Sequence, residues 1–309
     1  MKDFSRRSLM QTIAATVAIS AAPLPALAKD ETQQTASNLF VESNGIRYAY
    51  RRFGASDGIP LVFLMHFRGT MDSWDPAVVD PLAKRRPVIL FSNAGIGLSG
   101  GEAPKSIEAM AGHVEAFLDA LKLKTVDLLG FSIGGYIAQQ VALDRPGLVR
   151  RLILVGTGPQ GGEEMTHFSP EARAVISKAA GAAESLPIVF FAPSERSQTA
   201  ARAFLSRLAA RTAEREPQVT PKAAQAQIAA LIAWGTPPEG NRYGRLAELK
   251  LPVLVVNGSH DIMIPTINSY ILAQHLPDAK LIIYPDAGHG SLFQYHEDFV
   301  DEVSRFLQA

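Results

Sequence analysis

Short apolar runs and amphipathic stretches alternate along most of the chain. The apolar runs are almost free of polar residues, which is typical of strands buried on both faces of a parallel sheet. They lie at 60–65, 87–91, 126–129, 152–155, 253–256 and 281–284. Between or after these runs, apolar residues recur at helical spacing at 74–84, 107–121, 133–143 and 299–307. This alternation predicts a mainly parallel central α/β sheet flanked by helices.

The segment 39–52 has a different pattern. Apolar and polar residues alternate on both sides of the pair Asn44-Gly45. Alternation is the pattern of a half-buried strand, and Asn-Gly is a strong signal for a tight hairpin turn. We therefore expect an antiparallel hairpin at the start of the sheet.

The region 161–245 contains Ala-, Arg- and Glu-rich helical stretches with proline breaks and no convincing strand. Its apolar residues at 188–191, and Phe204, Leu205 and Trp234, need a surface to bury them. This favours a helical cap over the alternative of a disordered linker. The sequence thus predicts a core formed by 29–160 and 246–309, with 161–245 inserted as a cap over the carboxyl edge of the sheet.

Residues 1–28 differ in composition from the rest of the chain. They hold the pair Arg6-Arg7, an Ala-rich apolar run at 13–22 and the small residues of 26–28 before Lys29. This order is typical of a cleavable signal peptide, and the paired arginines are typical of a twin-arginine signal; an ordinary Sec signal is the alternative. The apolar run is short for a membrane span. We expect an exported, periplasmic protein with no stable membrane anchor after cleavage.

The composition and charge of the chain narrow the classes of partner that we expect. The chain has 309 residues, with Lys plus Arg and Asp plus Glu at 30 each. Nothing in this balance points to nucleic acid or an anionic surface, so a small-molecule substrate is expected.

The absence of cysteine excludes disulfides, thiolate metal sites and a cysteine nucleophile. No zinc or nucleotide motif is present, and we expect neither a metal nor a cofactor. The oligomeric state is left open.

The segment 130–134 has the form G-x-S-x-G, between an apolar strand and a helix, which is the context that a nucleophile elbow needs. Gly130 and Gly134 leave room for the tight turn, which would lift the Ser132 hydroxyl out of the sheet. The following helix would direct the Ile133 N–H towards a developing oxyanion. The alternative is that Ser132 only caps that helix.

Two later strand ends supply an acid and a base. Asp261 follows the strand at 253–256, and His289 stands between two glycines after the strand at 281–284, with backbone freedom to reach the site from an exposed loop. Carboxyl ends of strands are where open α/β sheets gather catalytic groups. Asp261 could instead cap a helix starting near Pro265, with Glu163 or Glu164 as the substitute acid.

Taken together, this layout resembles the α/β-hydrolase superfamily, in the capped esterase and haloperoxidase branch, over residues 39–309. Members tend to carry an H-G-x-P-G segment after the third strand, and the matching stretch here is 66–70, with Phe67 at the usual glycine position. The resemblance implies a second oxyanion donor at the N–H of Arg68, or of Phe67 if the loop is shifted. His66 is expected to be a buried structural residue that ties this loop together.

The resemblance implies a serine hydrolase of the carboxylesterase type, in which Ser132, Asp261 and His289 cleave an ester-like substrate through an acyl-enzyme. Alternatives are a cofactor-free perhydrolase or haloperoxidase, and a ligand-binding protein on a hydrolase scaffold. We expect the substrate to be small or medium in size and hydrophobic. The candidate pocket residues are Phe131, Met71, Trp74, Met263 and Trp234.

Overall fold

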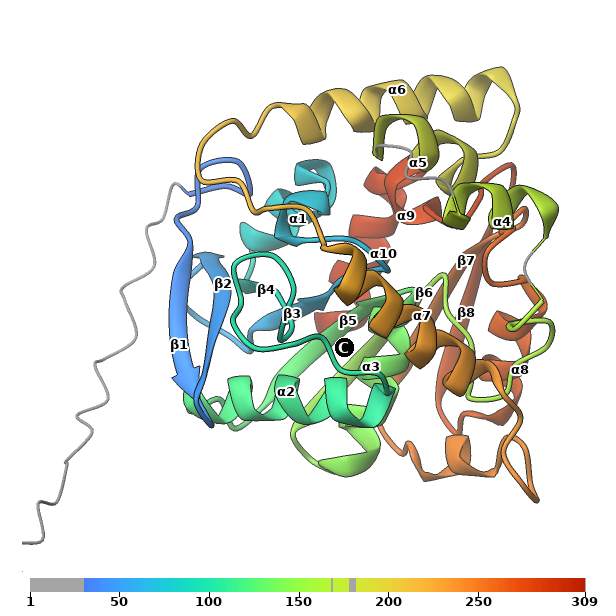
Figure 1. Ribbon diagram of the computed structural model, residues 1–309, viewed down its shortest axis with the longest axis horizontal. Helices are drawn as coiled ribbons and strands as arrows, with labels where there is room; N and C mark the ends of the chain where they lie inside the picture. The colour runs from blue at the N-terminus through green and yellow to red at the C-terminus, as the bar shows by residue number, and fades with distance from the viewer. Residues whose placement is uncertain (1–30, 168, 178–181, 309) are drawn as a thin grey trace, which may run out of the picture.

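The computed structural model describes residues 31–167, 169–177 and 182–308. The predicted signal peptide, 1–28, lies outside the described residues. Eight strands form one sheet in the order β1-β2-β4-β3-β5-β6-β7-β8 (Figure 1). The pairs from β4 to β8 are parallel, and β2 is antiparallel to both of its neighbours. This confirms the predicted mainly parallel α/β sheet. The strands are β1 (Leu39–Ser43), β2 (Ile46–Gly54), β3 (Leu61–Leu64), β4 (Pro87–Phe91), β5 (Val126–Phe131), β6 (Val149–Val155), β7 (Val253–Gly258) and β8 (Ala279–Tyr284).

The opening hairpin forms where the sequence predicts it. Asn44 and Gly45 both have positive φ, at 52° and 76°. Two left-handed residues in succession match the twist of a tight antiparallel turn, and Asn and Gly tolerate that conformation best.

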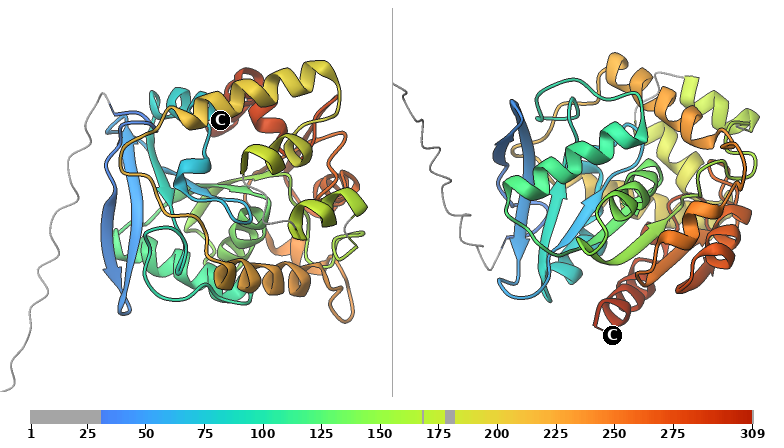
Figure 2. Two further views of the ribbon diagram at one scale, coloured as in Figure 1. Left: turned by 45° about the horizontal axis from the view of Figure 1, so that its top comes forward. Right: turned by 90° about the horizontal axis from the view of Figure 1, so that it is seen from below.

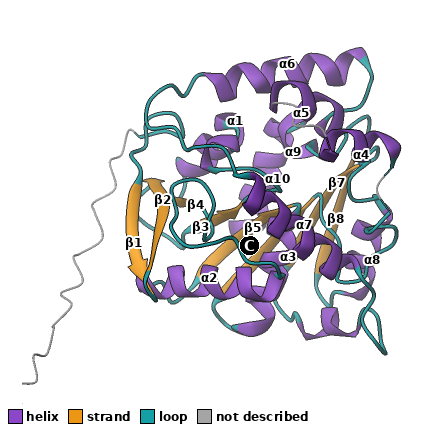
Figure 3. Cartoon of the chain, in the orientation of Figure 1, coloured by secondary structure: helices purple, strands orange, loops and turns teal. Residues whose placement is uncertain are grey.

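Helices cover both faces of the sheet, and two apolar clusters fill the spaces between (Figures 2 and 3). The first cluster lies under α2, α3 and α8, and the second under α1, α9 and α10. No helix in the described part of the chain is both long and apolar enough to cross a membrane. The helices outside the insert are α1 (Pro76–Ala83), α2 (Ile107–Ala120), α3 (Ile133–Asp144), α8 (Ile267–His275), α9 (Ser291–Gln294) and α10 (His296–Gln308), with the 3-10 turns η1 (Met71–Ser73) and η2 (Gly244–Glu248).

Four helices lie between β6 and β7, within the segment predicted as a cap: α4 (Pro170–Ser177), α5 (Ala182–Phe190), α6 (Glu195–Ala209) and α7 (Pro221–Gly235). Phe190 and Phe204 pack into the second apolar cluster, while Trp234 of α7 packs into the first. The insert therefore contributes to the apolar cores on both sides of the sheet. In Figure 1, α6 runs along the top of the molecule and α7 crosses in front of the sheet.

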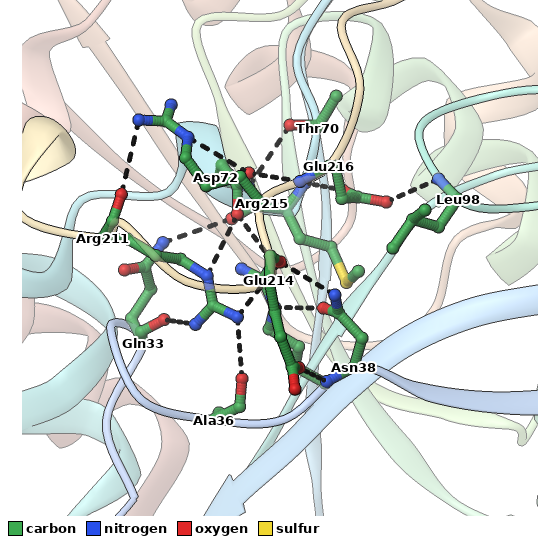
Figure 4. A network of polar contacts seen from close by, with 12 residues as sticks. Gln33, Ala36, Asn38, Thr70, Asp72, Leu98, Arg211, Glu214, Arg215 and Glu216 are labelled. Atoms are coloured by element: carbon green, nitrogen blue, oxygen red, sulfur yellow. Dashed lines mark hydrogen bonds and ion pairs between the residues drawn. The ribbon is translucent and has the colours of Figure 1, made fainter.

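The connection between α6 and α7 is fixed by buried charges (Figure 4). Asp72, after β3, receives hydrogen bonds from the Arg51 Nη2 at 2.6 Å and the Glu216 N–H at 2.7 Å, and its Oδ1 lies 3.4 Å from the Arg211 Nε. Arg211 also donates to the carbonyl oxygens of Gln33 and Ala36. Residues 211–216 thus join the insert to the segment before β1, to Arg51 of β2 and to the loop after β3. We call this set the Asp72 network.

Candidate functional site

Ser132 stands at the turn between β5 and α3. Its backbone has φ 57° and ψ −122°, a strained conformation for a residue with a side chain. Its hydroxyl makes no capping hydrogen bond to the helix. Helix capping therefore does not explain this serine. The strained turn is the geometry expected of a nucleophile elbow.

The two glycines beside Ser132 are required by close backbone approaches. A Cβ on Gly130 would collide with the carbonyl of Gly134, and one on Gly134 would collide with the carbonyl of Leu64 at the end of β3. The first turn of α3 therefore packs directly against β3. This contact places the end of β3, from which the loop 66–71 starts, beside the first turn of α3.

Asp261 and His289 form a buried pair. The Nδ1 of His289 lies 2.8 Å from the Oδ2 of Asp261, and both side chains are almost fully buried. The other carboxylate oxygen of Asp261 accepts the N–H groups of Met263 and Ile264. One oxygen thus fixes the turn before α8, and the other orients the imidazole. Asp261 does not cap α8, whose N-cap residue is Thr266. A carboxylate oxygen accepts, so Nδ1 is the donating nitrogen of this hydrogen bond and Nε2 is the ring nitrogen that takes no part in it.

His289 is 2% exposed, so the expectation of an exposed loop is wrong. The end of α5 covers this loop, where the His289 N–H donates to the Val189 carbonyl and the Gly290 N–H donates to the Phe190 carbonyl. A Cβ on Gly288 or Gly290 would collide with Phe190. The flanking glycines therefore permit contact with the insert, rather than giving the loop freedom to reach.

The serine and the histidine lie at the same edge of the sheet. The Ser132 N–H donates to the carbonyl of Val155, the last residue of β6. A Cβ on the next residue, Gly156, would be 3.1 Å from the His289 Nδ1. The ring of Phe131 packs on that of His289 with centroids 5.0 Å apart. The structure therefore gathers Ser132, Asp261 and His289 at the carboxyl ends of β5 to β8.

The substitute acids lie elsewhere. Glu163 accepts hydrogen bonds from Arg242 and Tyr243, and the exposed Glu164 lies 3.7 Å from His167. Among these carboxylates only Asp261 contacts His289.

The loop after β3 uses most of its N–H groups internally or with the insert. Gly69 N–H donates to the His66 carbonyl, Thr70 N–H to Ser73 Oγ, and Met71 N–H to Glu216 Oε2 at 2.7 Å. Arg68, at φ 60°, donates its N–H to the Gln227 Oε1 of α7 at 3.1 Å. The Phe67 N–H has no hydrogen bond within the described residues. Ile133 is the first residue of α3, so its N–H has no intrahelical acceptor.

The sequence model of a family described as alpha/beta hydrolase fold matches residues 59–294. This chain belongs to the α/β-hydrolase family.

This α/β-hydrolase is similar to a solved α/β hydrolase fold protein from Chitinophaga pinensis, with 40% identity, a TM-score of 0.85, and coverage of 90% of this chain and 100% of that one. It is 28% identical to pimeloyl-(acyl-carrier protein) methyl ester esterase of Aeromonas hydrophila, over 83% of this chain and 97% of that protein. The solved Est816, described as an N-acyl homoserine lactone degrading enzyme, is 28% identical, with a TM-score of 0.67 and coverage of 87% and 100%. The chain is thus a hydrolase of this fold.

A small cavity lies beside Ile133 in this α/β-hydrolase. Its volume is about 30 Å³, room for about two water molecules. Its walls come from the ends of β3 and β4, from α2 and α3, and from α7 of the insert. The apolar lining residues include Leu64, Phe91, Ile96, Met110 and Ile137, and the polar ones are His66, Ser92, Asn93 and Gln227.

None of the five pocket residues predicted from sequence lines that cavity. Met71, Trp74 and Phe131 are buried in the second apolar cluster. Trp234 stacks on Tyr136 and borders a second, smaller cavity near Arg242. Met263 is partly buried and touches both apolar clusters.

Sequence reasoning missed two polar residues of the insert, Gln227 and Glu216. Burial raises the pKa of Glu216, opposed by the N–H groups of Leu98 and Met71 that its carboxylate accepts. Gln227 lies on the buried, alanine-rich face of α7. A glutamine at helical spacing among alanines was the one local signal that could have marked it.

His66 gives this enzyme a testable pH dependence. Burial lowers the pKa of His66 from 6.5 to about 4, while its bond to the Phe67 carbonyl acts in the opposite direction. Below pH 6.5 the unfolded chain binds a proton that the folded chain does not, so folding stability falls as pH drops towards 4. We expect His66→Gln to remove about 2 to 3 kcal/mol of the stability lost between pH 7.5 and 4.5.

Urea unfolding of both proteins at the two pH values measures this difference. His167→Gln, which replaces an exposed histidine, is the control and should behave like the wild type. Equal pH dependence in the wild type and His66→Gln would show that His66 is not held neutral.

Proposed function

We propose that this protein is a serine hydrolase of the carboxylesterase type, which cleaves a carboxylic ester or related acyl substrate through an acyl-enzyme. The observation that carries the proposal is the position of Ser132. Its hydroxyl makes no capping hydrogen bond, its backbone forms a strained turn, and it lies at the sheet edge that holds the buried Asp261–His289 pair. A positioned nucleophile, a base and a group that orients the base are the parts that acyl transfer needs.

In the proposed reaction, the Nε2 of His289 takes the proton of Ser132 as the serine oxygen attacks the substrate carbonyl carbon. The N–H of Ile133 and an N–H of the loop 66–71 stabilise the oxyanion. The intermediate collapses, the leaving alcohol takes the proton from His289, and the acyl group stays on Ser132. Water, deprotonated by His289, then releases the acid and restores the serine. Asp261 holds the imidazole in the required tautomer throughout.

The substrate we propose is small or medium in size and hydrophobic. The apolar walls of the cavity beside Ile133 support a short apolar acyl group, because apolar lining with few polar groups favours such a ligand. Two relatives are named for cleaving a methyl ester and for degrading an N-acyl homoserine lactone. Open esters and lactones are therefore the first substrates to assay.

The proposal is tested by labelling the purified protein with a serine-directed fluorophosphonate and locating the adduct by peptide mass spectrometry. We expect one adduct, on Ser132, and turnover of nitrophenyl esters that falls as the acyl chain lengthens. Peracid formation that exceeds ester hydrolysis in peroxide and acetate would favour a perhydrolase. Tight ligand binding with neither labelling nor turnover would overturn the proposal in favour of a binding protein.

A further inference from the structure

The side-chain amide of Gln227 accepts a hydrogen bond from one of the two candidate oxyanion donors in the loop after β3. Its Oε1 accepts the Arg68 N–H at 3.1 Å. Because a backbone N–H can only donate, the atom facing it must be the oxygen, and the Nε2 must point elsewhere. The Nε2 donates to no residue in the part of the chain that the structure describes.

Gln227 and the proposed nucleophile turn border the same space. Gln227, Gly69, His66 and Ile133 all line the cavity of about 30 Å³. The first turn of α3 packs on the end of β3, and Arg68 stands in sequence between His66 and Gly69, which both line the cavity with Ile133. In the proposed reaction, a substrate carbonyl that uses the Arg68 N–H competes with the Gln227 oxygen that already accepts it.

The Gln227 side chain has the chemistry of a substrate acyl group. A carboxamide is a planar carbonyl with one heteroatom, as is an ester. It is 6% exposed, and it is carried by a face of α7 made mostly of alanines, including Ala223, Ala226 and Ala230. These small neighbours leave the longer glutamine as the side chain of that face that reaches the loop.

We propose that Gln227 is a gate residue, whose carboxamide must leave the Arg68 N–H before the substrate carbonyl can take that bond. This inference rests on the proposed function. The gate belongs to the free enzyme, so its displacement costs the same for substrate and for transition state. Such a cost raises KM and leaves kcat unchanged. The gate therefore favours substrates whose carbonyl is the stronger acceptor.

The same hydrogen bond would form if Gln227 had a loop-positioning role in place of a gating role. If Gln227 only held the loop in place, with the Phe67 N–H as the oxyanion donor, its loss would loosen the loop and lower kcat. Two substitutions separate the roles. Gln227→Leu keeps the size and removes the acceptor, whereas Gln227→Glu keeps an acceptor and strengthens it with charge.

For a gate, we expect Gln227→Leu to raise kcat/KM on short nitrophenyl esters by about 2- to 10-fold, through KM, which is the range of one neutral hydrogen bond. Gln227→Glu should lower kcat/KM at neutral pH. Gln225→Leu, an exposed glutamine on the same helix, should match the wild type. Amide hydrogen exchange of the peptide containing Arg68 should speed up in Gln227→Leu.

The outcomes are separable. A fall in kcat with Gln227→Leu and near wild-type kinetics with Gln227→Glu would overturn the gate in favour of loop positioning. Unchanged kcat/KM in Gln227→Leu would also overturn it, while active wild type leaves the proposed function standing. If wild type neither turns over esters nor takes the label on Ser132, the proposed function falls. In that case the gate falls with it, and hydrogen exchange still reports whether the Arg68 bond exists.

Discussion

Ser132→Ala should lower kcat on activated esters by roughly 10⁴-fold or more. The alanine removes the proposed nucleophile, and neither His289 nor the oxyanion donors can replace an oxygen that forms the acyl bond. The residual rate would come from substrate binding and oxyanion stabilisation alone. Steady-state kinetics on a short nitrophenyl ester measure the loss, and the fluorophosphonate adduct should disappear with it.

Ser304→Ala is the matched control for this loss. Ser304 is buried in α10, and its hydroxyl has no hydrogen-bond partner among the residues that the structure describes. Removing that hydroxyl should leave kcat and labelling as in the wild type. Retention of wild-type activity by Ser132→Ala would move the nucleophile to another residue.

Asp72→Asn should destabilise the folded protein by about 3 to 5 kcal/mol. The carboxylate of Asp72 is the counter-ion of the fully buried Arg51 and of Arg211. An amide cannot neutralise these guanidinium groups, so the variant leaves two buried arginines without the ion-pair partner that they share. Urea denaturation followed by circular dichroism gives the change in free energy of unfolding.

Asp119→Asn tests whether burial of the charges causes the loss of stability expected for Asp72→Asn. Asp119 forms a two-bond ion pair with Arg145, with both side chains well exposed. A pair of this kind contributes about 0 to 1 kcal/mol. If both variants lost the same small amount, the Asp72 network would contribute no more than a surface ion pair does.

The Asp72 network also limits which parts of the insert can move. Residues 211–216 are joined to the segment before β1 and to the loop after β3. In contrast, α7 reaches that loop through the single side-chain bond of Gln227.

Local patterns predicted most of the elements correctly. The apolar run at 87–91 coincides with β4, and the amphipathic segment 107–121 became α2, ending one residue earlier. The periodicity of apolar side chains within one strand or helix depends only on residues close together in sequence. It can therefore be recognised without knowing what packs against that strand or helix. The starts of β6 and β8 were less visible, because Arg150 and Arg151 in β6 and Lys280 in β8 interrupt the apolar run near the beginning of the strand.

The positions of Ser132, Asp261 and His289 were also predictable, since Ser132 follows β5 directly and the other two stand in the loops after β7 and β8. Parallel strands end at one edge of the sheet, so residues far apart in sequence become neighbours without further information. The predicted pocket residues, in contrast, do not line the cavity beside Ile133. Trp74 and Met71 are apolar residues near the site, and nothing local separates a core residue from a lining residue.

The sequence by itself determined the sheet, the strained serine turn and the three strand-end residues, because each depends on local backbone preference or on strand order. Only the tertiary structure decided what the insert does to the site. The bonds from Gln227 to Arg68 and from Glu216 to Met71 join residues 159 and 145 positions apart. Such bonds depend on how α7 and its preceding segment sit on the core, and local sequence patterns do not specify that packing.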